Sequence, residues 1–161
     1  MSKLLIPTLS LMLSSAAFPK EFPHTIKNVQ LINCYDGDTC TFRDKGQKIK
    51  IRLYGVDAPE KNQEFGRESR DSLTNFIKAS KTIDLKCTGK SYKRKVCEII
   101  ADGKSASEHQ VLKGLAWDSP KYSKGQFSKL ESEAKAKKIG LWSKDKQTRP
   151  ECYRNPKRKG C

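Results

Sequence analysis

Four carboxylates lie at the ends of short apolar segments, with a spacing that allows them to share one site. Asp36 and Asp38 flank a glycine, and Asp57 and Glu60 follow the alternating segment 48–54 (KIKIRLY). Carboxylates that are brought together repel one another unless a cation neutralises them. Because these ligands offer only oxygen, the pattern favours a hard ion such as Ca²⁺ or Mg²⁺.

Two arginines accompany the carboxylates. Arg52 lies in segment 48–54, a few residues before Asp57, and Arg94 begins a later apolar segment. A guanidinium group binds phosphate through two hydrogen bonds and stabilises charge that develops on a phosphoryl group. Each feature alone also has a simpler explanation: Asp-Gly-Asp is a common turn, segment 57–60 could cap a helix, and the arginines could be solvent-exposed charges.

Short strands are predicted on both sides of these residues. The Asp-Gly pair between two apolar runs indicates a hairpin, and segment 48–54 has the alternation of a half-buried strand. Two further β-branched runs follow after a helical pattern. We therefore expect five strands, at residues 26–32, 39–42, 48–54, 82–87 and 94–100.

Three helices are predicted between and after the strands. Segment 64–80 has an apolar stripe, segment 106–113 stops at Gly114, and segment 124–138 stops near Gly140. This order alone supports an α+β fold with a barrel or a curled sheet. The OB-fold, a five-stranded Greek-key β-barrel, here with three packed helices, fits the order and commonly binds nucleic acid.

The N-terminal residues have the composition of a secretory signal peptide. A basic start with Lys3 precedes the apolar run 4–18, which ends in small residues. We expect residues 1–17 to be removed after Ala17, and the protein to be secreted or periplasmic without stable membrane insertion. An uncleaved membrane anchor or a buried N-terminal strand remain alternatives. The expected mature chain comprises a folded domain at 18–142 and an irregular tail at 143–161.

Six cysteines, an even number in a chain with an export signal, favour disulfides over metal binding. No Cys-x-x-Cys pair is present and the two histidines are far apart in the sequence, which argues against a zinc site. Other connectivities remain possible, but the spacing favours three local pairs: Cys34 with Cys40, Cys87 with Cys97, and Cys152 with Cys161.

The charge balance points to a polyanionic partner. Lysine and arginine number 33 against 18 aspartate and glutamate, a formal net charge of +15. Nucleic acid is the first candidate, and an anionic membrane or a cell-wall polymer is the second. The tail is expected to add non-specific affinity for nucleic acid through its clustered basic residues, Arg149, Arg154, Lys157, Arg158 and Lys159.

Taken together, these motifs resemble the staphylococcal nuclease (thermonuclease) family over about residues 26–142. The matching blocks occur in the family's order, with few gaps. They are Asp36–Thr39 (DGDT), Arg52–Glu60 (RLYGVDAPE), Tyr92–Arg94 (YKR), Ala101–Lys104 (ADGK), Lys113–Ala116 (KGLA) and Gly140–Trp142 (GLW).

The resemblance implies a site for one Ca²⁺ ion. Asp38 and Asp57 match the two carboxylates that bind the ion directly. The backbone carbonyl of Ala58 matches a further ligand, and Asp36 matches a carboxylate that reaches the ion through water.

The resemblance also implies catalytic roles. Arg52 and Arg94 match the pair that grips the scissile phosphate, and Glu60 matches the carboxylate that activates or positions the attacking water. Tyr92 matches an aromatic residue that contacts the nucleotide, and Tyr122 falls at a second such place in a more loosely matching region.

The implied activity is that of a calcium-dependent, sugar-non-specific nuclease that leaves 3′-phosphates on DNA and RNA and favours single strands. We expect a monomer. Two positions depart from the family pattern: Ser91 replaces a lysine, and Pro120 replaces a tyrosine. A non-cutting binding module of the same fold and a cationic surface protein are the competing interpretations. The first usually lacks several acidic and arginine positions that are all present here, and the second leaves the ordered blocks unexplained.

Overall fold

The sheet is built from strands whose alternate side chains are apolar. The computed structural model describes residues 21–161, so the predicted signal peptide at 1–17 lies outside the described residues. Phe42 in β3 (Thr39–Asp44) and Ile51 in β4 (Gln47–Leu53) are fully buried, and they pack in one apolar cluster. The alternation that predicted β4 therefore arises from its core-facing side chains.

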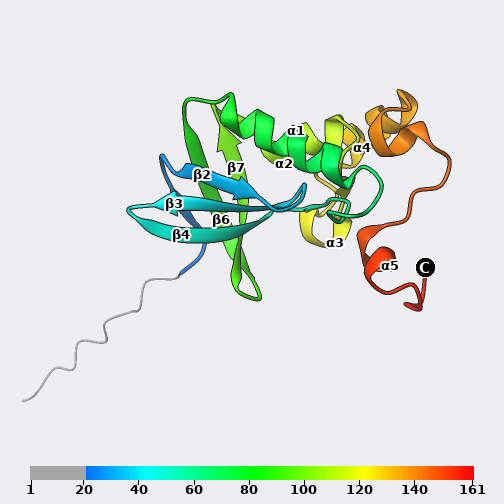
Figure 1. The fold of residues 1–161 in the computed structure, drawn as a ribbon, viewed down its shortest axis with the longest axis horizontal. Coiled ribbons are helices and arrows are strands. Elements are labelled where there is room, and N and C mark those ends of the chain that lie inside the picture. The colour runs from blue at the N-terminus through cyan, green and yellow to red at the C-terminus, as the bar shows by residue number, and fades with distance from the viewer. Residues whose placement is uncertain (1–20) are drawn as a thin grey trace, which may run out of the picture.

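The strands form a curled mixed sheet in the order β1-β6-β7-β4-β3-β2 (Figure 1). Among the strands of residues 21–161, β4 and β7 pair in parallel and the other pairs are antiparallel. A small second sheet joins β5 (Val56–Asp57) to β9 (Trp117–Asp118). The remaining bounds are β1 His24–Ile26, β2 Gln30–Cys34, β6 Ile83–Ser91, β7 Arg94–Ala101 and β8 Lys104–Ser105.

The helices pack along one side of the sheet and beyond its end (Figure 1). α1 (Gly66–Lys78) contacts β2 and α2 (Ala106–Leu112), and α2 in turn contacts β7 and α4 (Ser128–Ala136). Leu73 and Ile77 of α1 are fully buried, as the predicted apolar stripe requires. The expected α+β, OB-like fold is confirmed.

Two predicted elements are wrong in detail. The expected strand at 26–32 is divided into β1 and β2, because Asn28 takes a left-handed conformation with φ 55° between them. The expected helix at 124–138 begins only at Ser128, since Lys124 has φ 56° and ends a separate short helix, α3 (Pro120–Ser123).

The tail after Trp142 was expected to be irregular, but it contains a helix. A 3₁₀ turn, η1 (Gly140–Ser143), leads into an extended linker and then into α5 (Pro150–Arg154). Proline at the first position of α5 suits a helix start, because its missing N–H has no helical partner there. Pro150 is buried, so this short helix is docked on the rest of the protein.

Three disulfides have the pairing that the spacing favoured: Cys34–Cys40, Cys87–Cys97 and Cys152–Cys161. The first two join residues that face each other across antiparallel strand pairs, and the third closes the chain end onto α5. In the part of the chain that the structure describes, every cysteine is paired. The longest helix there, α1, has 13 residues, and none of these helices is suited to crossing a bilayer.

One partly buried carboxyl group links the sheet to α2. Glu98 on β7 accepts a hydrogen bond from the backbone N–H of Ser107 at 3.1 Å, at the start of that helix. Burial raises the pKa of Glu98 to about 7, although bonds from Ser107 and Ser105 oppose the shift. A raised carboxyl pKa contributes stability at low pH, and this contribution is lost as the pH rises through about 7.

We predict that the stability of the Glu98→Gln variant increases relative to that of the native protein as the pH rises. Glutamine keeps the hydrogen-bond acceptor and never ionises, so between pH 5 and pH 8 the difference in unfolding free energy should shift by about 1–2 kcal/mol in its favour. Denaturant unfolding at both pH values measures this shift. Exposed Glu108→Gln is the control, and an equal shift in both variants would contradict the assignment.

Candidate functional site

The turn that carries Asp36 and Asp38 packs tightly against α1 and α2. Asp36 accepts a hydrogen bond from the backbone N–H of Asp38 at 3.1 Å. The carbonyl of Gly37 accepts one from the side chain of Gln110 on α2, also at 3.1 Å. A Cβ at Gly37 would lie 1.8 Å from Oγ of Ser69 on α1, so only glycine fits this approach. The turn is therefore held in place by buried contacts.

A single arginine bridges two carboxylates from different elements. Arg52 on β4 donates from Nη1 to Oδ1 of Asp38 at 2.6 Å, and from Nη2 to Oδ1 of Asp57 at 2.5 Å. The same Nη2 also contacts the carbonyl of Val56 at 3.2 Å. Asp38 is almost fully buried, with a side-chain exposure of 2%. The two carboxylates are therefore held within the width of one guanidinium group.

These carboxylates lie in surroundings that disfavour their charge. Burial raises the pKa of Asp38 to about 6, against the opposing attraction of Arg52, and the nearby Asp36 adds to the increase. Burial likewise raises the pKa of Asp57 to about 6, with Arg52 again opposing and Asp38 repelling. One arginine therefore does not neutralise the three carboxylates, and the site favours further positive charge.

The second predicted arginine joins the group through a threonine. Arg94, at the start of β7, donates from Nη1 to Oγ1 of Thr39 at 3.1 Å. Thr39 in turn donates to Oδ1 of Asp38 at 3.0 Å. Arg52 thus contacts Asp38 directly, and Arg94 is linked to the same carboxylate through Thr39.

The loop after β5 completes the group. The pairing of β5 with β9 fixes Asp57 opposite Trp117. The backbone N–H of the next residue, Ala58, donates to Oδ2 of Asp38 at 2.9 Å, which ties this loop to the first turn. Both predicted metal-binding segments therefore meet at Asp38.

The donor set suits a hard divalent cation. Within residues 21–161, no three acidic, histidine or cysteine side chains lie close enough to enclose an ion by themselves. The candidate ligands are the carboxylates of Asp38 and Asp57 and the carbonyl of Ala58, which directly follows Asp57 in the chain, and all three supply oxygen. Ca²⁺ accepts such a partial oxygen set and completes its coordination with water.

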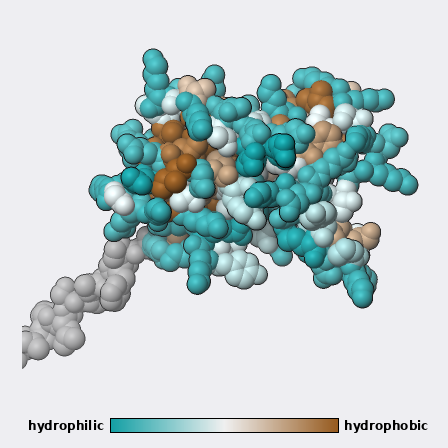
Figure 2. Space-filling model, viewed as in Figure 1, coloured by the Kyte–Doolittle hydropathy of each residue, from teal (hydrophilic) through white to brown (hydrophobic). Residues whose placement is uncertain are grey.

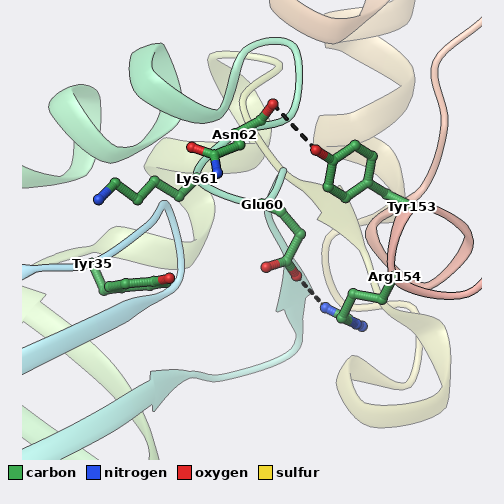
Figure 3. Close-up of a pocket in the computed structure, with 6 residues that line it drawn as sticks. All are labelled: Tyr35, Glu60, Lys61, Asn62, Tyr153 and Arg154. Atoms are coloured by element: carbon green, nitrogen blue, oxygen red, sulfur yellow. Dashed lines mark hydrogen bonds and ion pairs between the residues drawn. The ribbon is translucent and has the colours of Figure 1, made fainter.

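Glu60 follows Asp57 by three residues, but its side chain faces the C-terminal tail (Figure 3). Its Oε1 forms an ion pair with Nη1 of Arg154 on α5. From the same helix, the side chain of Glu151 adds to the upward shift of the Asp57 pKa, after burial and Asp38. The loop that carries Glu60 is therefore covered on one side by α5.

The two predicted nucleotide-contacting tyrosines are not drawn into this hydrogen-bonded group. Tyr92, in the turn between β6 and β7, is 97% exposed, and Tyr122 on α3 is 63% exposed. Exposed aromatic rings near a basic surface are available for stacking against bases.

The residues that sequence reasoning missed fall into two kinds. Thr39 was within a matched block, but nothing in its type indicated that it would link Asp38 with Arg94. Arg154 was predicted only as part of a basic tail, because its contact with Glu60 joins residues 94 positions apart. Buried Ser69 and Gln110, which support Gly37, had no local signal either.

Comparison with known proteins gives a consistent family match. Residues 50–144 match the family described as staphylococcal nuclease homologue. An uncharacterized endonuclease of Haemophilus influenzae is 34% identical over 128 residues, covering 78% of this chain and 71% of its own length. A second uncharacterized endonuclease, from Escherichia coli O157:H7, is 32% identical over 131 residues, covering 80% of this chain and 85% of the relative.

A plant relative extends well beyond this chain. Staphylococcal-like nuclease CAN1 of Arabidopsis thaliana is 36% identical over 115 residues, which is 71% of this chain. The aligned region is only 36% of the plant protein, so this chain spans about a third of that relative.

We predict that Gly37→Ala destabilises the protein by about 1–3 kcal/mol, since the added methyl group would displace Ser69 or Ala58 from a packed position. Thermal or denaturant unfolding measures the loss. Gly89→Ala in β6 is a matched control, because a Cβ there meets nothing within 4 Å. If the two substitutions destabilise equally, the tight packing of the turn is refuted.

Proposed function

Because the chain belongs to the staphylococcal nuclease family, we propose that it hydrolyses phosphodiester bonds in DNA and RNA with one Ca²⁺ ion as cofactor. The observation that carries the proposal is the shared arrangement of Asp38, Asp57 and Arg52, which Arg94 joins through Thr39. Fixed carboxylates and fixed arginines at one point are what metal-assisted cleavage of a phosphate ester requires.

The carboxylates provide the metal site. Asp38 and Asp57 would bind the ion directly, with the Ala58 carbonyl as a further ligand and Asp36 acting through water. When bound, the ion would supply Lewis acidity and a position for water. The raised pKa values of Asp38 and Asp57, caused by burial, support this role, because a cation offsets the repulsion that raises them further.

The arginines provide positive charge for the phosphate. Hydrolysis adds negative charge to a five-coordinate phosphorus, so fixed cations at that point lower the barrier. Arg52 now donates from both Nη atoms to the carboxylates that are proposed to bind the ion, and Arg94 donates to Thr39, so phosphate binding would redirect these donors. Both are proposed to bind the oxygens of the scissile phosphate.

Glu60 is proposed to orient or deprotonate the attacking water. Its loop begins directly after the metal-binding segment, and its carboxylate faces an open cavity (Figure 3). From this loop, the carboxylate would accept a hydrogen bond from the attacking water once substrate and ion are bound.

The proposed substrates are DNA and RNA, single strands in particular, cut to leave 3′-phosphates. The net charge of +15 supports a nucleic-acid partner, and the face shown in Figure 2 is predominantly hydrophilic. Exposed Tyr92 and Tyr122 support base stacking, which works best on unpaired strands. The three disulfides support an exported protein, secreted or periplasmic, and we expect it to act as a monomer.

We predict calcium-dependent cutting that a paired substitution abolishes. The oxidised protein should cut single-stranded DNA and RNA with Ca²⁺ but not with a chelator. Glu60→Gln combined with Arg94→Gln should lower the rate by about a thousandfold or more, because both transition-state charge stabilisation and water positioning are lost. Gel electrophoresis gives the rate, and mass spectrometry detects the 3′-phosphates.

The control removes the same charges elsewhere. Glu68→Gln with Arg43→Gln changes two exposed residues and should retain near-native cutting. A folded native protein that binds DNA without cutting it would instead indicate a binding module. Equal rates in the two paired variants would refute the assigned site.

A further inference from the structure

An open cavity separates the Glu60 loop from the C-terminal tail, and its lining has the chemistry of a nucleotide site (Figure 3). Two tyrosines, two cations, an amide and one carboxylate line it. These residues are Tyr35, Glu60, Lys61, Asn62, Tyr153 and Arg154. They come from three segments: the turn after β2, the loop before α1, and α5.

The tyrosines on the two sides of the cavity are available to a ligand. Tyr35 is 55% exposed and Tyr153 is 45% exposed. The Nζ atom of Lys61 lies 5.7 Å from the centre of the Tyr35 ring, so a cation already accompanies this aromatic surface. Aromatic faces beside cations bind stacked bases and their phosphates without sequence preference.

The wall formed by α5 is held in place by specific contacts. Tyr153 donates from its hydroxyl group to the carbonyl of Asn62 at 3.3 Å, and Gln63 donates from its side chain to the carbonyl of Thr148. The Cys152–Cys161 disulfide closes the segment behind these contacts. Arg154 is thereby held at the cavity by its ion pair with Glu60.

We propose that this cavity is a second nucleotide subsite, in which Tyr35 and Tyr153 stack a base next to the scissile bond and Arg154 binds the adjoining phosphate. The subsite rests on the proposed nuclease function, since the scissile phosphate must lie at Arg52 and Arg94. It is separate from the exposed surface of Tyr92, which follows β6 at another turn. The C-terminal disulfide segment therefore acts as part of the substrate cleft, beyond adding general positive charge.

Binding of short oligonucleotides tests the stacking part. Affinities of tetrathymidylates are measured in chelator, where nothing is cut, with one base removed at each position in turn. At one position, base removal should weaken binding by the native protein about tenfold. Tyr153→Ala should weaken binding of the intact strand several-fold, and base removal at that position should then weaken binding much less than in the native protein, because only Tyr35 is left to stack the base.

The phosphate part is tested by a matched pair of charge removals. Arg154→Gln should raise KM for calcium-dependent cutting about tenfold at low salt, whereas Arg154→Lys should keep KM close to the native value. The difference in KM between the native protein and Arg154→Gln should shrink as the salt concentration rises. Arg158→Gln removes the same charge from the same disulfide loop, outside the cavity, and should raise KM much less. If Arg154→Gln lowers kcat alone, Arg154 only holds Glu60 and the subsite is overturned.

The two proposals fail in different ways. If base removal and Tyr153→Ala weaken binding independently at every position while the native protein still cuts DNA, the subsite is wrong and the nuclease function stands. If the binding effects coincide as predicted but no cutting occurs with Ca²⁺, the cavity binds a base as proposed, while the nuclease function and the placement beside a scissile bond are wrong. Circular dichroism of each variant establishes that it is folded.

Discussion

The central constraint is the cluster that buried Asp38 forms with the partly buried side chains of Asp57 and Arg52. Two carboxylates from separate loops share one guanidinium group at 2.6 and 2.5 Å, and burial raises both of their pKa values to about 6. The arrangement is short of positive charge, since Asp36 also contributes to the repulsion at Asp38. A divalent cation and a bound phosphate with its own arginine would balance this group in a way that the protein alone does not.

The rest of the fold serves to hold these loops together. β3 and β4 pair so that Thr39 lies opposite Arg52, which places the first turn beside the bridging arginine. The parallel pairing of β4 with β7 brings the chain carrying Arg94 alongside. Gly37 allows α1 and α2 to press on the turn from behind, through Ser69 and Gln110. Helices and sheet thus fix a site whose own electrostatics would drive it apart.

Local patterns were enough to predict most of this. Alternation in segment 48–54 located β4, and the spacing of acids and arginines located the residues that meet at Asp38. What failed depended on single conformations or distant contacts. Asn28 and Lys124 adopt left-handed backbone, which asparagine tolerates better than lysine but which the hydrophobic pattern does not locate, so two elements were divided unexpectedly. The docking of α5 could not be predicted, because Arg154 and Glu60 are linked only by the folded chain.

The most direct test of this account is calcium-linked stability. Unfolding of the native protein, Asp38→Asn and Asp57→Asn is compared in chelator and in Ca²⁺ at about a hundred times its dissociation constant, where binding to the folded state adds about 2.7 kcal/mol. The account predicts that Ca²⁺ stabilises the native protein by this amount and that either asparagine variant loses most of the effect. The account would be contradicted if Ca²⁺ left the stability of the native protein unchanged, or if the asparagine variants were stabilised by Ca²⁺ as much as the native protein.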